Sequence, residues 1–156
     1  MKNIKLAVFD IDGVFTSGNT IYNQDGSVSK AFHDHDSYSL HMLRNAGVKI
    51  LFISADTRVN QKWAEHQNVE YICSNNKLNT LKEYLRKAKI LPKNVMYMGD
   101  DIRDRLVMEY VGFPFCPQNA NHNIRNIAIY STKHNGGDGA VREAVEYLLT
   151  SEKSNK

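Results

Sequence analysis

The chain has 156 residues, of which 42% are apolar and 24% are charged, and its formal net charge is +3. These values are typical of one globular domain with its own core, and they exclude a disordered chain. The small positive excess suits anionic small molecules but is too weak and dispersed to predict nucleic-acid binding. No apolar run approaches the about 20 residues of a membrane span, and no signal peptide is apparent, so a cytoplasmic protein is expected.

Strand-like and helix-like segments alternate along the chain. Short runs that are apolar on both faces predict buried parallel strands at 5–9, 48–54, 69–73, 94–98, 112–116 and 127–131. Helical periodicity predicts helices at 37–46, 59–67, 77–88, 104–111 and 140–150. We therefore expect one three-layer, doubly wound α/β domain over residues 1–150, with a mostly parallel sheet and a flexible tail at 151–156. In such folds the active site lies beyond the carboxyl ends of the strands.

One segment breaks this alternation. Residues 18–32 contain two β-rich runs on either side of Asp25-Gly26, which predicts a hairpin. The hairpin directly follows the first strand, so it is placed to flank the active site as a flap. The alternative is a hairpin without a role at the site.

Acidic residues follow two of the predicted strands. Asp10 and Asp12 come after the first strand and precede Gly13, which permits a sharp turn. Asp100 and Asp101 come directly after the strand at 94–98. Carboxylates from two strand ends can converge on Mg²⁺, or one can attack while another transfers a proton.

Two further residues at strand ends can bind a phosphate. Ser54 closes the strand at 48–54 with a hydroxyl group, and Lys77 opens the helix that follows the strand at 69–73. The lysine can neutralise both a phosphate and a carboxylate nucleophile. Taken alone, a lysine such as Lys77 is more often a surface cation, so the hypothesis depends on the whole set.

These residues resemble the four ordered motifs of the haloacid dehalogenase superfamily of phosphohydrolases. The motifs are Asp10-Ile11-Asp12-Gly13-Val14, Ser54, Lys77, and Gly99-Asp100-Asp101 with Asp104. Within the superfamily, the chain is similar over about residues 4–149 to the capless phosphatases of 2-keto-3-deoxy sugar acid phosphates. The most similar type hydrolyses 3-deoxy-manno-octulosonate 8-phosphate, and such enzymes serve lipopolysaccharide or sialic acid biosynthesis.

The resemblance implies a mechanism. Asp10 attacks phosphorus to form an aspartyl phosphate, and Asp12 protonates the leaving oxygen and then activates water. Mg²⁺ is held by Asp10, the backbone carbonyl of Asp12, and Asp100. Ser54 and Lys77 bind phosphate oxygens. Supporting roles fall to Asp104, which orients Lys77 or a metal-bound water, and to Asp101.

The resemblance also implies where the sugar binds. Substrate contacts are expected from His33, His35, Asp36, Ser37, Asp56, Lys77 and Arg142. Two histidines and two acids at 33–36 could instead bind a metal, and Asp36 is also interpreted as the N-cap of the helix at 37–46.

Asp56 departs from the expected pattern, because the octulosonate enzymes usually have an arginine at that position. A carboxylate there is closer to the phosphatases of nonulosonate (sialic acid-type) 9-phosphates, which are the alternative. Relatives of this size cover their sites with neighbouring subunits, so the resemblance implies a homotetramer. Residues 136–139 and Arg142 would then act near a site, in cis or in trans, and the alternative for the glycine run is a plain loop before the helix at 140–150.

Two other classes of function remain open. The chain could be a non-catalytic, phosphatase-like structural or regulatory subunit. It could also be a phospho-accepting receiver domain, although that class has its aspartate after a central strand. Cys73 and Cys116 are expected to be buried free thiols, because they lie 43 residues apart without metal-type spacing.

Overall fold

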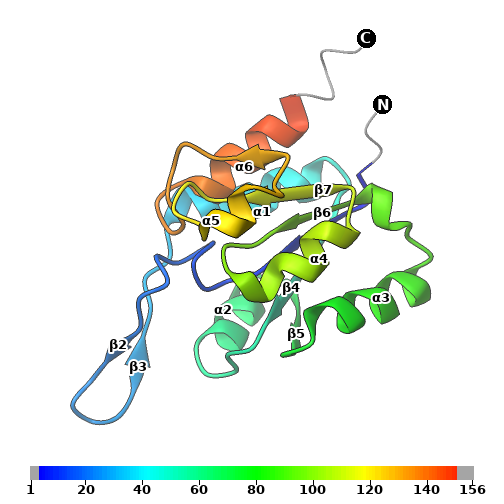
Figure 1. Cartoon of the computed structure of the whole chain (residues 1–156). Helices are drawn as coiled ribbons and strands as arrows, with labels where there is room; N and C mark the ends of the chain where they lie inside the picture. Colours follow the sequence, from blue (N-terminus) through cyan, green and yellow to red (C-terminus); the bar gives the residue numbers. More distant parts are fainter. Residues whose placement is uncertain (1–3, 151–156) are drawn as a thin grey trace.

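A central sheet of six parallel strands organises the domain (Figure 1). This computed structural model describes residues 4–150. The strand order is β5-β4-β1-β6-β7-β8, with the first strand in the middle. The strands are β1 Leu6–Phe9, β4 Lys49–Ser54, β5 Glu70–Cys73, β6 Val95–Met98, β7 Phe113–Cys116 and β8 Tyr130–Ser131. Chain order reverses at β1, where the crossovers leave towards β4 on one side and β6 on the other, so the carboxyl end of β1 is the switch point at which doubly wound folds bind ligands.

Helices cover both faces of the sheet. The helices α1 Asp34–Asn45, α2 Asn60–His66 and α6 Ala140–Thr150 pack on one face, and α3 Lys77–Ala88, α4 Arg105–Tyr110 and α5 His122–Arg125 pack on the other. Strand β1 shows why two cores form. Ala7 and Phe9 point into the first core, and Leu6 and Val8 point into the second, since successive side chains alternate across a strand. The predicted three-layer α/β fold is confirmed.

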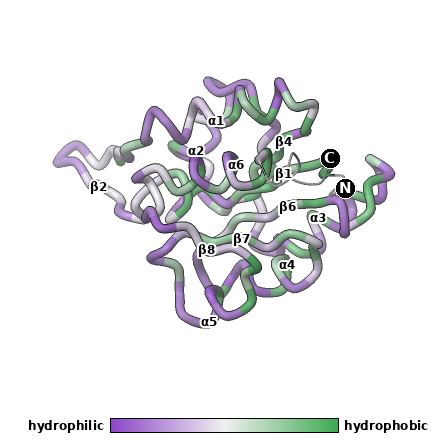
Figure 2. The backbone as a smooth tube through the Cα atoms, turned by 90° about the horizontal axis from the view of Figure 1, so that it is seen from above, coloured by the Kyte–Doolittle hydropathy of each residue, from purple (hydrophilic) through white to green (hydrophobic). Residues whose placement is uncertain are grey.

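The predicted hairpin is present as two short antiparallel strands, β2 Ile21–Tyr22 and β3 Val28–Ser29. Figure 1 shows it projecting from the body of the domain, and Figure 2 shows that its tip is largely hydrophilic while the central strands are hydrophobic. Ile21 and Tyr22 on the hairpin are both exposed. A role as a flap stays a prediction.

The first helix corrects one prediction. Helix α1 begins at Asp34 with His33 as its N-cap residue, so Asp36 lies inside the first turn and does not cap this helix. The Asp36 carboxylate is fully buried and accepts hydrogen bonds from the backbone N–H groups of Gly139 (3.1 Å) and Arg142 (2.8 Å). It therefore caps helix α6, which begins more than a hundred residues later.

Smaller differences concern short elements and one cysteine. Helix α5 was not predicted, because four residues are too few to show a period, and β8 is shorter than the predicted 127–131. Both cysteines are free, but only Cys116 is buried; Cys73 is exposed, contrary to expectation. Within residues 4–150, no helix has the length and apolar character needed to cross a membrane.

Candidate active site

The predicted catalytic residues converge at the carboxyl ends of the strands. Phe9 in β1 is in register with Phe52 in β4 and Met98 in β6, so the residues that follow these strands emerge at one edge of the sheet. A cavity of about 310 Å³ opens there. Its lining residues are Asp10, Asp12, Ser54, Ala55, Asp56, Thr57, Arg58, Lys77 and Arg103. Four predicted catalytic residues and Asp56 are thus brought together.

A buried ion triad lies at the base of this cavity. Lys77 Nζ is 2.7 Å from Asp10 Oδ2 and 2.7 Å from Asp104 Oδ1, and all three side chains are nearly or fully buried. The other oxygen of Asp10, Oδ1, accepts a hydrogen bond from the Ile11 N–H at 2.7 Å. Burial disfavours the ammonium ion, but the two carboxylates outweigh this effect and raise the pKa of Lys77. Lys77 is therefore a fixed cation beside the predicted nucleophile.

Asp104 holds this triad in place. Its Oδ1 also accepts from the Tyr97 hydroxyl at 2.6 Å, and its Oδ2 accepts from the backbone N–H groups of Asp100 (3.1 Å) and Asp101 (3.2 Å). The chain can fold so tightly here because Gly99 has no Cβ; a Cβ would overlap the Asp104 carboxylate. The predicted orienting role of Asp104 agrees with these contacts, and Asp101 closes a capping box with Asp104.

The carboxylates of Asp10, Asp100 and Asp104 form a cluster whose oxygens lie within 4.8 Å of one another. Gly13, with φ +79°, permits this approach, because a Cβ there would overlap the Asp100 carboxylate. Three carboxylates face a single lysine, and oxygen-rich sites with excess negative charge are those that divalent cations such as Mg²⁺ prefer. The donor set therefore fits a divalent metal.

The pKa values of two carboxyl groups in the cluster are raised. Burial raises the pKa of Asp10 to about 6, with Lys77 opposing and Asp104 adding to the shift. Burial, followed by the charges of Asp10 and Asp104, raises the pKa of Asp100 to about 7. A bound cation would stabilise the ionised form of both carboxyl groups.

These shifts predict how the metal-free protein responds to pH. The folded chain holds the two protons more tightly than the unfolded chain, whose carboxyls ionise near pH 3.8. Stability should therefore fall as pH rises from about 4 to about 7. Since one pKa unit corresponds to about 1.4 kcal/mol, the effect is on the order of a few kcal/mol. Urea unfolding in EDTA at several pH values measures it, with Asp100→Asn flattening the slope; a free energy of unfolding that rises across this window would contradict the prediction.

Asp12 faces a different set of partners. Its carboxylate is 2.7 Å from Lys30 Nζ and accepts a hydrogen bond from Asn60 Nδ2 at 2.8 Å. The Asp12 carboxylate is not part of the acidic cluster. The predicted use of its backbone carbonyl oxygen by a metal stays a prediction. The Asp12 carboxylate is partly exposed, and Asp12 lines the cavity, so the side chain can meet a substrate oxygen.

Sequence reasoning missed four polar residues at the site. Lys30 comes from the hairpin and Asn60 begins α2, while Arg58 and Arg103 line the cavity. Lys30 also donates to Asp56 Oδ2 at 2.7 Å, and the Arg58 guanidinium donates to both Asp56 oxygens at 3.3 Å. Burial alone would raise the pKa of Asp56, but the bonds from Lys30 and Arg58 outweigh it and lower the pKa to about 2. Arg58 could have been expected at the site, because it lies only two residues after Asp56 in the sequence.

Apart from Asp56 and Lys77, the residues predicted to contact the sugar lie outside the cavity, at the junction of α1 and α6. None of His33, His35, Ser37 and Arg142 lines the cavity. The rings of His33 and His35 contact each other edge to face, and Ser37 Oγ donates to the His33 carbonyl. Arg142 pairs with Glu146 and lies over the Tyr38 ring. Asp36 is fully buried beneath this junction, so its carboxylate cannot contact a substrate directly.

The glycine-rich segment before α6 braces the catalytic loop. Gly137 N donates to the Val14 carbonyl at 3.0 Å, and a Cβ on Gly136 would overlap the Gly13 carbonyl. The segment is in turn held by Asp36 through Gly139. Residues 136–139, predicted to act near a site, therefore support the site of their own chain.

Comparison with known proteins agrees with this geometry. Residues 57–144 match the haloacid dehalogenase-like hydrolase family, and similarity to individual members extends over nearly the whole chain. The chain belongs to the haloacid dehalogenase-like hydrolase family. The predicted resemblance and the predicted enzyme class, a phosphatase, are confirmed.

Several curated relatives of the chain are 3-deoxy-D-manno-octulosonate 8-phosphate phosphatases. The chain is 34% identical over 151 residues to the 3-deoxy-D-manno-octulosonate 8-phosphate phosphatase KdsC of Salmonella typhi, covering 95% of this chain and 80% of that protein. Its counterpart in Escherichia coli K12 is 32% identical over 154 residues, with the same coverage. A solved phosphatase of this type from Moraxella catarrhalis, in complex with magnesium, phosphate and a KDO molecule, has a TM-score of 0.92 and 31% identity, covering 96% of this chain and 88% of that one.

Proposed function

We propose that the chain is a Mg²⁺-dependent phosphomonoesterase that hydrolyses a 2-keto-3-deoxy sugar acid phosphate of the 3-deoxy-manno-octulosonate 8-phosphate type. The observation that carries the proposal is the placement of Asp10, which is paired with Lys77 and belongs to the acidic cluster, at the base of a cavity that Asp12 also lines. The names of the relatives and the magnesium, phosphate and KDO in the Moraxella catarrhalis structure support it. Bound at Asp10, Asp100 and the Asp12 carbonyl, Mg²⁺ would supply positive charge to the phosphoryl group.

Each residue of the site then has a defined task. Asp10 attacks phosphorus while the bond to the sugar oxygen breaks, and Asp12 gives that oxygen its proton. Water next attacks the aspartyl phosphate, loses a proton to Asp12, and releases phosphate and Asp10. Lys77, fixed by Asp104, neutralises charge on the nucleophile and the phosphate, and the Ser54 hydroxyl binds a phosphate oxygen.

The α1–α6 junction supports a second part of the proposal. In a homotetramer, His33, His35, Ser37 and Arg142 would contact the sugar acid bound to a neighbouring subunit. Each is at least partly accessible in the isolated chain, and none lines its own cavity. Asp36 would position this set by holding α6 against α1. A cavity without a cap domain also needs such cover to exclude water.

A second candidate substrate is a nonulosonate 9-phosphate. The observation that favours it is Asp56, a carboxylate at the cavity wall where the octulosonate enzymes usually carry an arginine. A reversed charge at this position is expected to change which substrate group is accepted.

Steady-state kinetics on both sugar acid phosphates tests the proposal. We expect kcat/KM on octulosonate 8-phosphate to exceed that on nonulosonate 9-phosphate, and the reverse order would establish the second candidate. A tenfold preference for unrelated phosphates would overturn the sugar acid assignment. Absence of turnover on every phosphate tried with Mg²⁺ would favour a non-catalytic subunit.

A further inference from the structure

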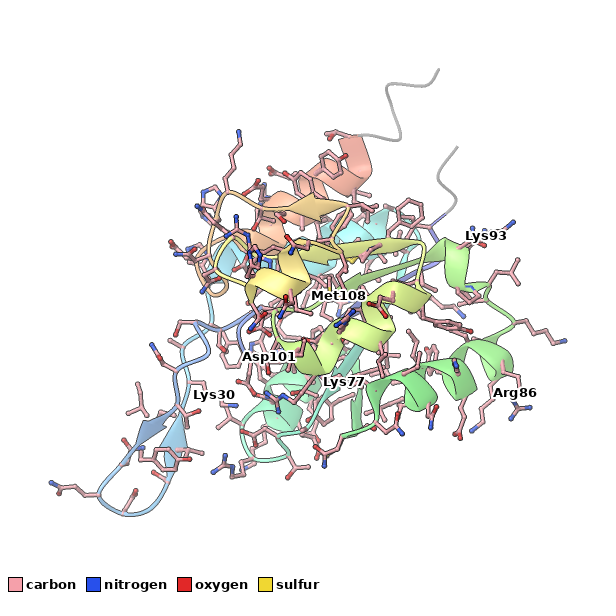
Figure 3. The ribbon with its side chains drawn as sticks, viewed as in Figure 1. Lys30, Lys77, Arg86, Lys93, Asp101 and Met108 are labelled. Atoms are coloured by element: carbon pink, nitrogen blue, oxygen red, sulfur yellow. The ribbon has the colours of Figure 1, made fainter. Side chains whose placement is uncertain are left out.

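A buried lysine connects the hairpin to the catalytic wall. Lys30 follows β3 at the base of the hairpin (Figure 3). Its side chain is only 1% exposed. Its Nζ lies 2.7 and 3.0 Å from the two oxygens of Asp12, 2.7 Å from Asp56 Oδ2 and 3.0 Å from Asn60 Oδ1. A buried ammonium is costly unless it is paired and hydrogen-bonded, and here two carboxylates and an amide oxygen satisfy it.

Asn60 completes the same arrangement from the other side. It is fully buried at the start of α2, and its Nδ2 donates to Asp12 Oδ2 (2.8 Å) and to Ser54 Oγ (3.2 Å). Both oxygens of Asp12 are therefore fixed by donors that come from two elements outside its own loop. Asp56 anchors the lysine in turn, because its Oδ2 accepts from Lys30 while the Arg58 guanidinium donates to both of its oxygens.

We propose that Lys30 is a positioning residue, through which the hairpin sets the orientation of the Asp12 carboxylate for proton transfer to the leaving oxygen. The inference rests on the proposed function and deepens it. A proton-transferring group must lie within hydrogen-bond reach of the substrate oxygen, and a small displacement from that position lowers the reaction rate strongly. While the hairpin is in place, Lys30 keeps the Asp12 side chain oriented towards the leaving oxygen. If the hairpin is displaced, Lys30 moves away and Asp12 loses this orientation. Asp56 and Asn60 are the anchors that make this coupling rigid.

The simpler explanation is that Lys30 only holds the hairpin to the domain. The two explanations differ in their dependence on the leaving group. In the first step the phosphorus–oxygen bond breaks, and a sugar alkoxide needs a proton from Asp12, whereas p-nitrophenolate departs without one. Because general acid catalysis contributes about 10²–10⁴-fold, a misaimed Asp12 should impair a sugar phosphate far more than p-nitrophenyl phosphate.

The test is therefore a ratio of two kcat/KM values in the full-length enzyme. For Lys30→Met, we expect kcat/KM on octulosonate 8-phosphate to fall about 10²-fold further than kcat/KM on p-nitrophenyl phosphate. Water activation in the second step also needs Asp12, so a burst of p-nitrophenolate equal to the enzyme concentration should precede slower turnover. Lys30→Arg should restore part of the ratio, because it keeps the charge but shifts its position.

Lys62→Met is the matched control, since Lys62 is an exposed lysine on the neighbouring helix α2. It should leave both kcat/KM values and their ratio unchanged. Equal losses on both esters for Lys30→Met would show a merely structural role and overturn the inference, as would no loss on either. If Lys30→Met does not fold, the same ratio is measured on Lys30→Arg. A larger loss on octulosonate 8-phosphate than on p-nitrophenyl phosphate then supports the inference, and equal losses overturn it. A wild-type enzyme that hydrolyses neither ester would refute the proposed function itself, and the inference with it.

Discussion

Replacing Asp10 with asparagine is expected to lower kcat by about 10⁴-fold or more, the scale on which loss of a catalytic nucleophile acts. The amide cannot attack phosphorus, but it has nearly the same shape as the carboxylate. Its oxygen can still accept from the Ile11 N–H, and Lys77 keeps its ion pair with Asp104. The fold should therefore persist. Steady-state turnover of octulosonate 8-phosphate and circular dichroism measure the two effects.

Asp25→Asn provides the control for this change, because Asp25 is an exposed carboxylate in the turn of the hairpin. It should leave kcat unchanged. Acid quenching of the wild-type enzyme during turnover should trap one phosphate per chain, detectable as a mass shift that Asp10→Asn lacks. Near-normal turnover by Asp10→Asn would show that the reaction does not pass through a covalent intermediate on this residue.

Removal of divalent metal is expected to reduce turnover to background, and restored Mg²⁺ should recover it. The physical reason is the crowding of Asp10, Asp100 and Asp104, whose combined charge Lys77 alone does not balance. Without a cation, the net negative charge of this cluster would repel an incoming phosphate. The same cation should raise the melting temperature, because it binds the folded cluster and not the unfolded chain.

EDTA treatment followed by titration with Mg²⁺ measures both quantities. EDTA that has been saturated with Mg²⁺ beforehand is the control and should have no effect. Asp100→Asn removes one carboxylate of the cluster, so it should raise the Mg²⁺ concentration needed for half-maximal rate. Full activity in EDTA would contradict the metal assignment.

The catalytic core could be predicted from the sequence because parallel strands place their carboxyl ends together. Asp10, Ser54 and Asp100 each stand at or directly after a buried apolar run, and Lys77 opens the helix that follows another. Short apolar runs identify such strands without any knowledge of tertiary contacts. Asp56, which only the family resemblance predicted at the site, also lines the cavity two residues beyond Ser54.

What could not be predicted depends on contacts between distant segments. Lys30 meets Asp12 only because the hairpin returns its base to the first loop, and no periodicity encodes that return. Asn60 resembles any polar residue at the start of a helix. Asp36 was interpreted as a local cap, because local capping is the commoner role of aspartate before a helix. Its actual partners, Gly139 and Arg142, are invisible in the sequence near it.

The brace between residues 136–139 and the loop after β1 affects the order in which the enzyme is completed during synthesis. Asp10, the proposed nucleophile, is made well before Gly136 and Gly137, which support its loop. Until α6 is made, the Asp36 carboxylate also lacks the two N–H groups that satisfy it. A ribosome-bound chain that already contains all of the proposed catalytic side chains still lacks the contacts that fix them, so we expect phosphatase activity to arise only after residues 136–142 have been made.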